Sequence, residues 1–304
     1  MPGQISAIVV SYNTVRLLDR AIQSLIKSSE LVDGVEIIVI DNASDDGSPR
    51  MVREKFSNVR LVQLTRNVGF AAGTNVGLRM ARGEQLLLLN PDAELLHDAL
   101  PTLSAFLAER PWLAAVGPRL IYPDGAPQDS AFHFPGMGQI LLDFFPVHSR
   151  ILKSRLNGRY GPRHEPFAVD HPLGACMLIS RSAIDDVGLL DESFFMYCEE
   201  VDWCIRARER GWEIYHHPGA VAVHYAGKST EQRSAAMFKQ LHQSRSLLYQ
   251  KHYGRAFRQT AELIAQLGLR REMNHVHSLA RKGTISKRQA ADRIRACRSI
   301  LSNQ

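Results

Sequence analysis

Two acidic side chains stand directly after apolar runs, where they could bind a nucleotide or a metal ion. Asp41 ends the run Val35–Ile40, and Asp92 follows the run Leu86–Leu89. An ionised carboxylate accepts hydrogen bonds from a base and binds hard divalent cations. Open α/β sheets bind ligands outside the carboxyl ends of their strands. We therefore expect a site that handles both a nucleotide and a metal ion.

A second set of reactive side chains lies much later in the chain. It comprises Glu199, Glu200, Asp202 and the lone His224. A carboxylate beside a hydroxyl can take its proton as a new bond forms, and imidazole is a common metal ligand. Each has an ordinary structural alternative. Glu199 suits the positive end of a helix dipole, Asp202 suits a helix cap or an ion pair with Arg206, and His224 suits simple packing.

The elements that must position these residues alternate between strands and helices. Short apolar runs predict strands, and apolar residues at helical spacing predict helices between them. This alternation indicates an α/β fold with a largely parallel sheet and right-handed crossovers. The predicted strands are Ile5–Val10, Val35–Ile40, Val59–Leu64 and Gln85–Leu89, and the helices lie around 17–26, 51–56 and 71–81.

Each of these four strands is followed by a polar cluster. Asp, Asn and Gly also serve as helix caps and turn residues, which is the alternative for any one cluster. Four clusters at one edge of a parallel sheet favour a ligand cleft. The clusters are Ser11-Tyr12-Asn13, Asp41-Asn42-Ala43-Ser44-Asp45, Arg66-Asn67-Val68-Gly69 and Asn90-Pro91-Asp92.

The second half of the chain changes in character. Residues 123–170 are rich in Pro, Gly, His and aromatic residues, which predicts long loops and short helices. Regular structure then resumes, and from residue 231 onward the pattern is helical. The predicted elements are strands Gly174–Ile179, Glu213–Tyr215 and Ala220–Val223, the helix Val201–Arg210, and helical breaks near Gly254, Gly268 and Gly283.

Composition limits the class of protein. The 304 residues are 45% hydrophobic and 22% charged, which is ordinary for a globular protein. No apolar run reaches membrane-spanning length, and the N-terminus lacks a signal-peptide pattern. The four cysteines form no CxxC pair and are read as reduced thiols. These features predict a cytoplasmic protein without a transmembrane helix.

The C-terminal segment is strongly basic. Residues 245–304 carry 13 Lys/Arg and 3 Asp/Glu, whereas residues 1–244 carry 24 and 28. Such a segment indicates an anionic partner or, alternatively, a solvated helical tail. Because few aromatic residues are interspersed, we favour an anionic membrane surface over nucleic acid, with the protein peripheral to the inner face of the cell membrane.

The ordered motifs between residues 5 and 230 resemble family 2 glycosyltransferases. The resemblance rests on the four polar clusters, on Phe195-Met196-Tyr197-Cys198-Glu199-Glu200-Val201-Asp202 with Arg206, and on Pro218-Gly219-Ala220 with the segment beginning at His224. Within the family, the chain is similar to bacterial rhamnosyltransferase-like enzymes of surface polysaccharide assembly. The resemblance implies a GT-A (Rossmann-like) fold and a nucleotide-diphosphate sugar donor.

The resemblance also implies a mechanism, an in-line displacement with inversion that adds one sugar such as rhamnose. The chain lacks the Gln-x-x-Arg-Trp signature of processive relatives. The donor would be a dTDP- or UDP-sugar, and the acceptor a saccharide or a polyprenyl-diphosphate-linked saccharide. By resemblance, Asp41 binds the base imide. The other nucleotide-binding residues are Ser11, Tyr12, Asn13, Arg66, Asn67 and Asn90.

Metal and acceptor chemistry follow from the same resemblance. The family's Asp-x-Asp motif falls on Asn90-Pro91-Asp92, which leaves Asp92 as the main ligand of Mg²⁺ or Mn²⁺. His224 is the predicted second ligand. The family's base falls on Glu200, where Asp is usual, so Glu199 and Asp202 remain alternatives or supporting residues.

Two other functions stay open at this point. One is a non-catalytic nucleotide-sugar-binding module, which the departures at Asn90 and Glu200 allow. The other is a nucleotidyltransferase, although Ser11-Tyr12-Asn13-Thr14 is not its Gly-rich phosphate loop. We expect a catalytic domain at residues 1–230, with a nucleotide-sugar half (1–122) and an acceptor half (123–230), followed by a basic helical extension (231–304).

Overall fold

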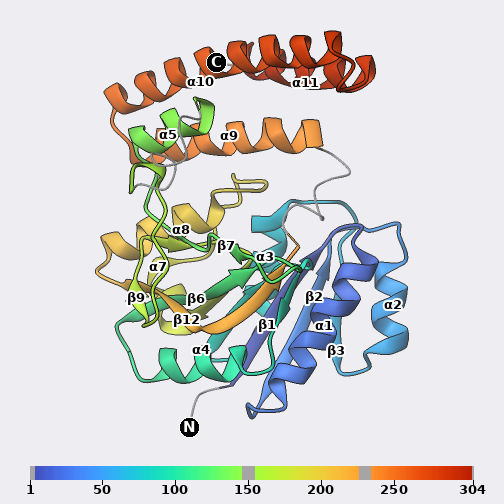
Figure 1. Cartoon of the computed structure of the whole chain (residues 1–304). Helices are drawn as coiled ribbons and strands as arrows, with labels where there is room; N and C mark the ends of the chain where they lie inside the picture. The colour runs from blue at the N-terminus through green and yellow to red at the C-terminus, as the bar shows by residue number, and fades with distance from the viewer. Residues whose placement is uncertain (1–3, 146–154, 226–233, 303–304) are drawn as a thin grey trace. The chain divides into compact units, whose positions relative to one another are not determined.

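The computed structural model describes residues 4–145, 155–225 and 234–302 (Figure 1). The chain divides into two compact units. The first comprises residues 1–134, 160–195 and 199–229, and the second residues 135–159, 196–198 and 230–304. The domain division at residue 230 stays a prediction.

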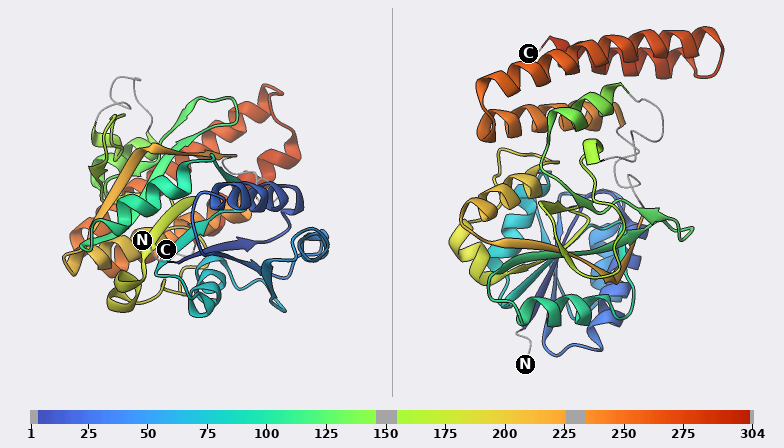
Figure 2. Two further views of the ribbon diagram at one scale, coloured as in Figure 1. Left: turned by 90° about the horizontal axis from the view of Figure 1, so that it is seen from below. Right: turned by 60° about the vertical axis from the view of Figure 1, so that its left-hand side comes forward.

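The first unit is built on one large sheet with helices on its faces (Figure 2). Its main strand order is β3-β2-β1-β4-β11-β6-β12-β5, with short strands β7 and β9 paired at its side. The fold class is thereby confirmed as α/β. The strands are β1 (Ile5–Ser11), β2 (Val35–Asp41), β3 (Val59–Gln63), β4 (Gln85–Leu89), β5 (Ala93–Leu95), β6 (Leu113–Ile121), β7 (Pro127–Gln128), β9 (Phe167–Ala168), β11 (Cys176–Ser180) and β12 (Glu213–His224).

The four predicted N-terminal strands pair in parallel. In this register Ser11 pairs with Asp41, and Asp41 pairs with Gln63, so neighbouring strands end at the same edge. The register places the polar clusters after these strands along one edge of the sheet. Elsewhere the pairing is mixed: β6 and β12 are parallel, whereas β11 is antiparallel to both β4 and β6.

Alternate residues of these strands pack against helices on opposite faces. Ala7 and Val9 share a core with helix α1 (Val15–Ser29), while Ile8 and Val10 share a core with α3 (Phe70–Met80). Burying a Val or Ile side chain contributes about 1.5–3 kcal/mol. Burial on both faces explains why the strands are continuously apolar. The flanking set is completed by α2 (Ser48–Lys55), α4 (Ala99–Ala108), α7 (Arg181–Val187) and α8 (Glu199–Glu209).

Two features of this sheet differ from the sequence prediction. We predict two strands at Glu213–Tyr215 and Ala220–Val223, but β12 is a single strand with an irregular register between His217 and Val221. Pro218 lies in this interval, and its missing N–H cannot join a regular ladder. We also predict no element for residues 99–121, where α4 and β6 lie.

The stretch from 123 to 170 contains only short elements in its described part, as predicted. Besides β7 and β9, these are β8 (Ala131–Phe132), α5 (Met137–Phe144) and the 3-10 turn η1 (Arg155–Asn157). β8 pairs with β10 (His171–Pro172) in a separate two-stranded sheet. Residues 146–154 of this stretch lie outside the described residues.

The second unit is helical, as predicted for the C-terminal segment. It contains α5, α9 (Ser234–His252), α10 (Arg255–Arg281) and α11 (Lys287–Leu301). The breaks near Gly254 and Gly283 are confirmed, but the break near Gly268 is wrong, because Gly268 lies inside α10. A Cβ at Gly268 would lie 2.2 Å from the Phe144 ring, so the glycine serves close packing. No described helix is long and apolar enough to cross a membrane.

Candidate functional site

Asp41 is a buried carboxylate with one oxygen available. It is 1% exposed at the end of β2, and its Oδ2 accepts a hydrogen bond of 3.0 Å from the Ser44 amide. Its Oδ1 has no hydrogen-bond partner among the described residues. A buried acceptor left unpaired costs about 1–3 kcal/mol, and more when charged. Asp41 therefore presents an acceptor that a ligand N–H would satisfy.

The loops after β1 and β2 are tied to each other beside Asp41. The Asn13 amide donates to Ser44 Oγ at 3.0 Å, and the Asp45 amide donates to Asn13 Oδ1 at 2.9 Å. Asn13 has a positive φ of 54°, which Asn tolerates better than most residues. Ser11 is buried, and its Oγ lies 2.9 Å from Thr14 Oγ1. Ser11 and Asn13 thus shape this edge, and Tyr12 lies between them, partly exposed.

The loop after β3 is organised by Asn42, a residue we do not predict as functional. Its Oδ1 accepts from the Val68 amide at 3.1 Å, and its Nδ2 donates to the Gly69 carbonyl at 2.9 Å. Asn67 Oδ1 accepts from the Gly69 amide at 2.9 Å, while Arg66 is exposed. The side chain of Asn67 is therefore engaged within its own loop, and Arg66 remains accessible to a ligand. The signal for Asn42 is its place directly after Asp41 in a polar cluster.

Asp92 and His224 are brought together by strand pairing. β5 and β12 are antiparallel with His224 opposite Ala93, and the Tyr225 amide donates to the Asp92 carbonyl at 2.9 Å. Both side chains are buried, and His224 Nε2 lies 3.5 Å from Asp92 Oδ1. The structure thus joins the two predicted metal ligands, which are 132 positions apart in the sequence.

This pair suits a divalent cation that is also held by a phosphate. A carboxylate oxygen and an imidazole nitrogen are acceptable ligands for Mn²⁺ and Mg²⁺. Within the described residues, no cluster of three or more His, Cys, Asp or Glu could hold a metal ion. Glu94 is instead ion-paired to Arg20 at 2.8 Å. Two protein ligands leave coordination positions for diphosphate oxygens and water, as is usual for Mg²⁺ bound to nucleotides.

Glu200 sits in the first turn of α8 against Gly174. A Cβ at Gly174 would lie 3.1 Å from the Glu200 carboxyl carbon, so a larger residue here would press on the Glu200 side chain. Burial raises the pKa of Glu200, and hydrogen bonds from the backbone amides of Glu200, Val201 and Gly174 oppose that rise. Its Oε2 has no partner among the described residues and is free to accept a proton.

Residues 174 and 175 connect Glu200 with the Asn90–Asp92 loop. Gly174 contacts the Glu200 carboxyl group, and the carbonyl of the next residue, Ala175, accepts from the Asn90 amide at 2.9 Å. Two consecutive residues therefore contact the candidate base and the candidate metal loop. Sequence reasoning missed Gly174, and its only signal is a glycine just before the strand Cys176–Ser180.

The two neighbouring acids of α8 differ from each other in environment. Glu199 is 6% exposed, and burial, followed by the charge of Glu200, raises its pKa well above the ordinary value. Asp202 is fully buried in an ion pair of 2.9 Å with Arg206, the pairing that the sequence spacing allows. Arg206 also donates to the carbonyls of Val187 and Leu189 at 2.9 Å each. The Asp202 pair therefore fastens α8 to the segment after α7.

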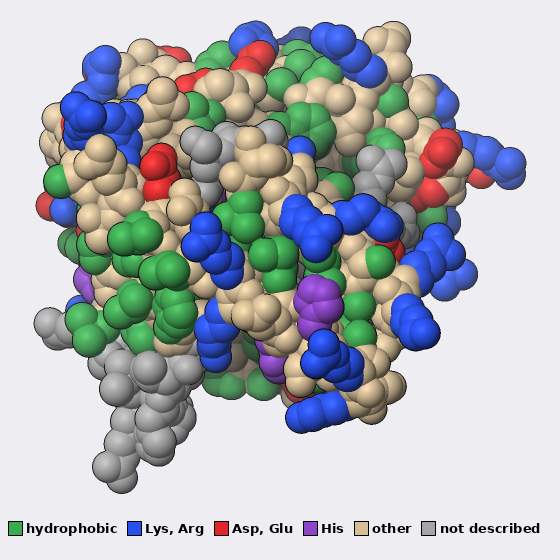
Figure 3. Space-filling view, turned by 90° about the horizontal axis from the view of Figure 1, so that it is seen from above, with side chains coloured by type: hydrophobic (Ala, Val, Ile, Leu, Met, Phe, Trp, Pro, Cys, Tyr) green, Lys and Arg blue, Asp and Glu red, His purple; other side chains and the backbone are tan. Residues whose placement is uncertain are grey.

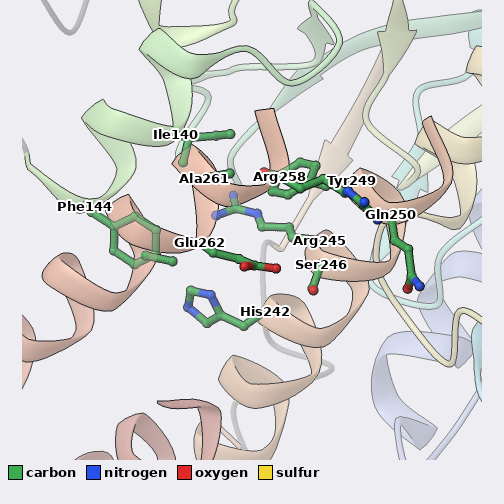
Figure 4. Close-up of a pocket in the computed structure, with 11 residues that line it drawn as sticks. Ile140, Phe144, His242, Arg245, Ser246, Tyr249, Gln250, Arg258, Ala261 and Glu262 are labelled. Carbon is green, nitrogen blue, oxygen red and sulfur yellow. The ribbon is translucent and has the colours of Figure 1, made fainter. Parts of the chain in front are cut away.

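The helical unit holds a cavity of about 240 Å³. Figure 4 shows side chains from α5, α9 and α10 converging on it. Arg245 is ion-paired with Asp143 at 2.9 Å, and the buried Nε of Arg258 has no hydrogen-bond partner among the described residues. Ile140 and Phe144 form part of an apolar wall. The cavity thus combines guanidinium donors with apolar surface.

Comparisons with known proteins agree on one family. The family model for glycosyl transferase family 2 matches residues 6–188. An N-acetylglucosaminyl-diphospho-decaprenol L-rhamnosyltransferase of Mycobacterium tuberculosis is 30% identical over 273 residues, which cover 84% of this chain and 87% of that protein. The rhamnosyltransferase WbbL of Escherichia coli K12 is 25% identical over 209 residues, covering 61% of this chain and 75% of WbbL.

The structural comparison supports the same fold. A Pyrobaculum calidifontis mannosyltransferase, solved with GDP-Man and Mn²⁺, matches with a TM-score of 0.62 and 17% identity, covering 100% of this chain and 88% of that one. These comparisons support a glycosyltransferase. They support neither a nucleotidyltransferase nor a non-catalytic module. The family model covers more than half of the sequence, so this chain belongs to glycosyl transferase family 2 and is a glycosyltransferase with the GT-A fold.

Proposed function

We propose that this enzyme transfers one sugar, rhamnose, from a dTDP- or UDP-sugar to a saccharide or polyprenyl-diphosphate-linked saccharide acceptor, with inversion. The observation that carries the proposal is the bridge of residues 174–175 between Glu200 and the Asn90–Asp92 loop. This bridge brings Glu200, whose Oε2 has no hydrogen-bond partner among the described residues, near the loop that carries Asp92 of the buried Asp92–His224 pair. The rhamnosyltransferase relatives support the choice of sugar and of a lipid-linked acceptor.

Donor binding is assigned to the edge where β1, β2 and β3 end. Asp41 Oδ1 accepts the imide N–H of uracil or thymine, since it is a buried acceptor that lacks a partner among the described residues. Tyr12 covers the base or ribose, with Ser11 and Asn13 shaping its loop. Arg66 contacts the phosphates from the loop that Asn67 orders, and Asn90 contacts the ribose, a phosphate or a bound water.

Glu200 acts as the general base. Its Oε2 takes the proton of the acceptor hydroxyl while that oxygen attacks the anomeric carbon from the face opposite the leaving diphosphate. Asp92 and His224 would hold Mg²⁺ or Mn²⁺, whose charge would offset that developing on the diphosphate. Burial, followed by the charge of Glu200, raises the pKa of the adjacent Glu199, so Glu199 keeps its proton beside the ionised base, and Asp202 supports the helix through Arg206.

Replacing Asp41 by Ala is expected to weaken binding of UDP or dTDP. A hydrogen bond to a charged acceptor contributes about 1.5–3 kcal/mol, so Kd should rise about 10- to 150-fold. Thermal shifts with UDP and dTDP, with and without Mn²⁺, measure the change. Wild type with ligand at about 100 times Kd should gain about 2.7 kcal/mol in stability.

The matched control for this experiment is Asp45→Ala, which removes an exposed carboxylate from the same loop. It should leave Kd close to that of wild type. Equal weakening by both variants would mean that Asp41 acts only through local negative charge. Absence of any shift of the wild type with either diphosphate would refute the proposed donor class.

We also propose that the basic helical extension binds an anionic membrane surface. Arg281 and Lys282 end α10, Lys287 and Arg288 begin α11, and all four are exposed. Figure 3 shows many Lys and Arg side chains, and fewer acidic ones, on the face seen from above. The cavity with Arg245 and Arg258 beside its apolar wall adds a place for a lipid phosphate group.

Replacing Arg281, Lys282, Lys287 and Arg288 together by Gln should reduce binding to phosphatidylglycerol vesicles. Each basic residue near an anionic surface contributes about 1 kcal/mol, so partitioning should fall on the order of a thousandfold at low salt. Sedimentation with vesicles measures it, and pure phosphatidylcholine vesicles are the control. Turnover with a soluble acceptor should not change. Unchanged sedimentation of the variant would refute the role of this basic turn.

A further inference from the structure

Gln128 lies against the candidate metal ligand His224 on the side away from Asp92. Gln128 Oε1 is 3.1 Å from His224 Nδ1, while His224 Nε2 is 3.5 Å from Asp92 Oδ1. The two ring nitrogens of His224 therefore face two different oxygen-bearing side chains. Gln128 lies outside the sequence motifs of the family resemblance.

The sheet fixes all three side chains. Gln128 lies on β7, which pairs with the end of β6 through Leu120, and β12 pairs with the same end of β6 through Ala222. His224 in turn lies opposite Ala93, next to Asp92. Because Gln128 and His224 lie on paired strands and Asp92 directly precedes β5, the side chains meet without any further loop having to close.

A neutral imidazole carries one N–H and one lone pair, so the neighbour of one nitrogen decides the role of the other. If Gln128 Oε1 accepts from Nδ1–H, then Nε2 presents its lone pair toward Asp92 Oδ1. Two acceptor atoms 3.5 Å apart repel each other unless a cation lies near both. In metal sites, a ligating histidine almost always donates its other N–H to such a partner.

We propose that Gln128 is a positioning residue, which accepts the Nδ1–H of His224 and thereby aims the Nε2 lone pair at the metal site beside Asp92. The inference rests on the proposed role of His224 as a ligand. Glutamine suits this task because its carboxamide oxygen accepts without bringing an extra negative charge next to Asp92.

The test compares Gln128→Leu, which removes the acceptor, with Gln128→Glu, which can accept from Nδ1–H but cannot donate. The first measurement is the long-range ¹H–¹⁵N NMR spectrum of the metal-free protein at alkaline pH, with His224 assigned by the His224→Ala variant. Wild type and Gln128→Glu should both show the Nδ1-protonated tautomer. Gln128→Leu should show a mixture or the other tautomer.

The second measurement is Mn²⁺ titration by calorimetry in the presence of UDP or dTDP. Loss of such a supporting partner typically weakens metal binding about 10- to 100-fold, so Gln128→Leu should show that loss and Gln128→Glu should restore most of it. Gln128→Leu with the wild-type tautomer would overturn the inference. So would a wild type that matches Gln128→Leu and differs from Gln128→Glu in the tautomer spectrum, because it would mean that Gln128 donates to Nδ1 through its NH₂ group.

Failure of the proposed ligand role gives a different result. If His224→Ala leaves Mn²⁺ affinity unchanged, His224 is not a metal ligand, and the proposal that Gln128 aims it at a metal fails with it. If His224→Ala weakens Mn²⁺ binding while Gln128→Leu changes neither readout, only the inference about Gln128 fails.

Discussion

Replacing Glu200 by Gln is expected to lower kcat about 10²- to 10⁴-fold, the usual contribution of a positioned general base. Gln has nearly the same shape as Glu but cannot take the acceptor's proton. Its neutral amide keeps most contacts with the Gly174 region, so nucleotide binding should stay close to wild type. Product formation from a dTDP- or UDP-sugar measures the first effect, and calorimetry with the nucleotide measures the second.

The pH dependence of the wild type follows from the same carboxyl group. Because burial raises the pKa of Glu200 above its ordinary value of 4.5, the base becomes ionised only at a higher pH. The acidic limb of kcat/KM should therefore have its midpoint above 4.5, with turnover rising as pH increases through it. In Glu200→Gln, the pH profile of the residual kcat/KM should lack this acidic limb.

Stability should change in the opposite direction from activity. In the unfolded chain the Glu200 carboxyl ionises near its ordinary pKa, whereas in the folded protein it keeps its proton to higher pH. The folded state therefore binds more protons in that interval, and the free energy of unfolding falls as pH rises through it. Glu200→Gln lacks this loss, so its Tm at neutral pH should exceed that of wild type, with the difference shrinking in acid.

Glu199→Gln is the matched control, because Glu199 is the adjacent buried acid with a raised pKa. It should also raise Tm at neutral pH but keep most turnover. Removing the Glu199 carboxyl should leave the acidic limb close to that of wild type, because burial is the cause that raises the pKa of Glu200. Greater loss of turnover in Glu199→Gln than in Glu200→Gln would reverse the assignment of the base.

Replacing Asp92 by Asn should have a comparably large effect, through the metal site. The substitution removes the charged ligand next to His224 Nε2, so Mn²⁺ affinity in the presence of UDP or dTDP should fall. Removing one group that stabilises transition-state charge costs about 10²- to 10³-fold in kcat. Chelation of divalent cations from the wild type should give a loss of the same kind, restored by added Mn²⁺ or Mg²⁺.

Glu94→Gln serves as the control for Asp92→Asn, since Glu94 follows two residues later but is ion-paired to Arg20. Its Mn²⁺ titration should match wild type. If Asp92→Asn binds Mn²⁺ as the wild type does, the metal is not held at this loop. Calorimetric titration of both variants distinguishes loss of the metal site from a general effect of changing this loop, because Glu94→Gln is the control variant in the same loop.

Local patterns predict much of the first unit. The apolar runs Ile5–Val10 and Val35–Ile40 form strands because both faces are buried, and helical spacing predicts α1 and α3. The edge at which Asp41 lies follows from parallel pairing alone. In contrast, α4 and β6 are missed, and β12 is predicted as two strands, because its Pro218 reads locally as a break and only pairing with β6 makes the strand continuous.

The second unit shows the limit of single-residue rules. Glycine lowers helix propensity by about 1 kcal/mol, which is why Gly268 predicts a break. The helix nevertheless continues through Gly268, because the absence of a Cβ lets the Phe144 ring pack directly against it. Gly268 and Phe144 are far apart in the sequence, so the local residue pattern around either one does not predict their contact.

By itself, the sequence determined the family motifs, the α/β alternation and the acids placed after strands, because these depend on short-range periodicity and residue type. Only the tertiary structure decided which of those acids meet. Strand register put His224 beside Asp92 and Gln128 on the second nitrogen of His224, and the packing of α8 put Glu200 against Gly174. Register depends on pairing between segments distant in the chain, so the partners of the predicted residues follow from the folded sheet.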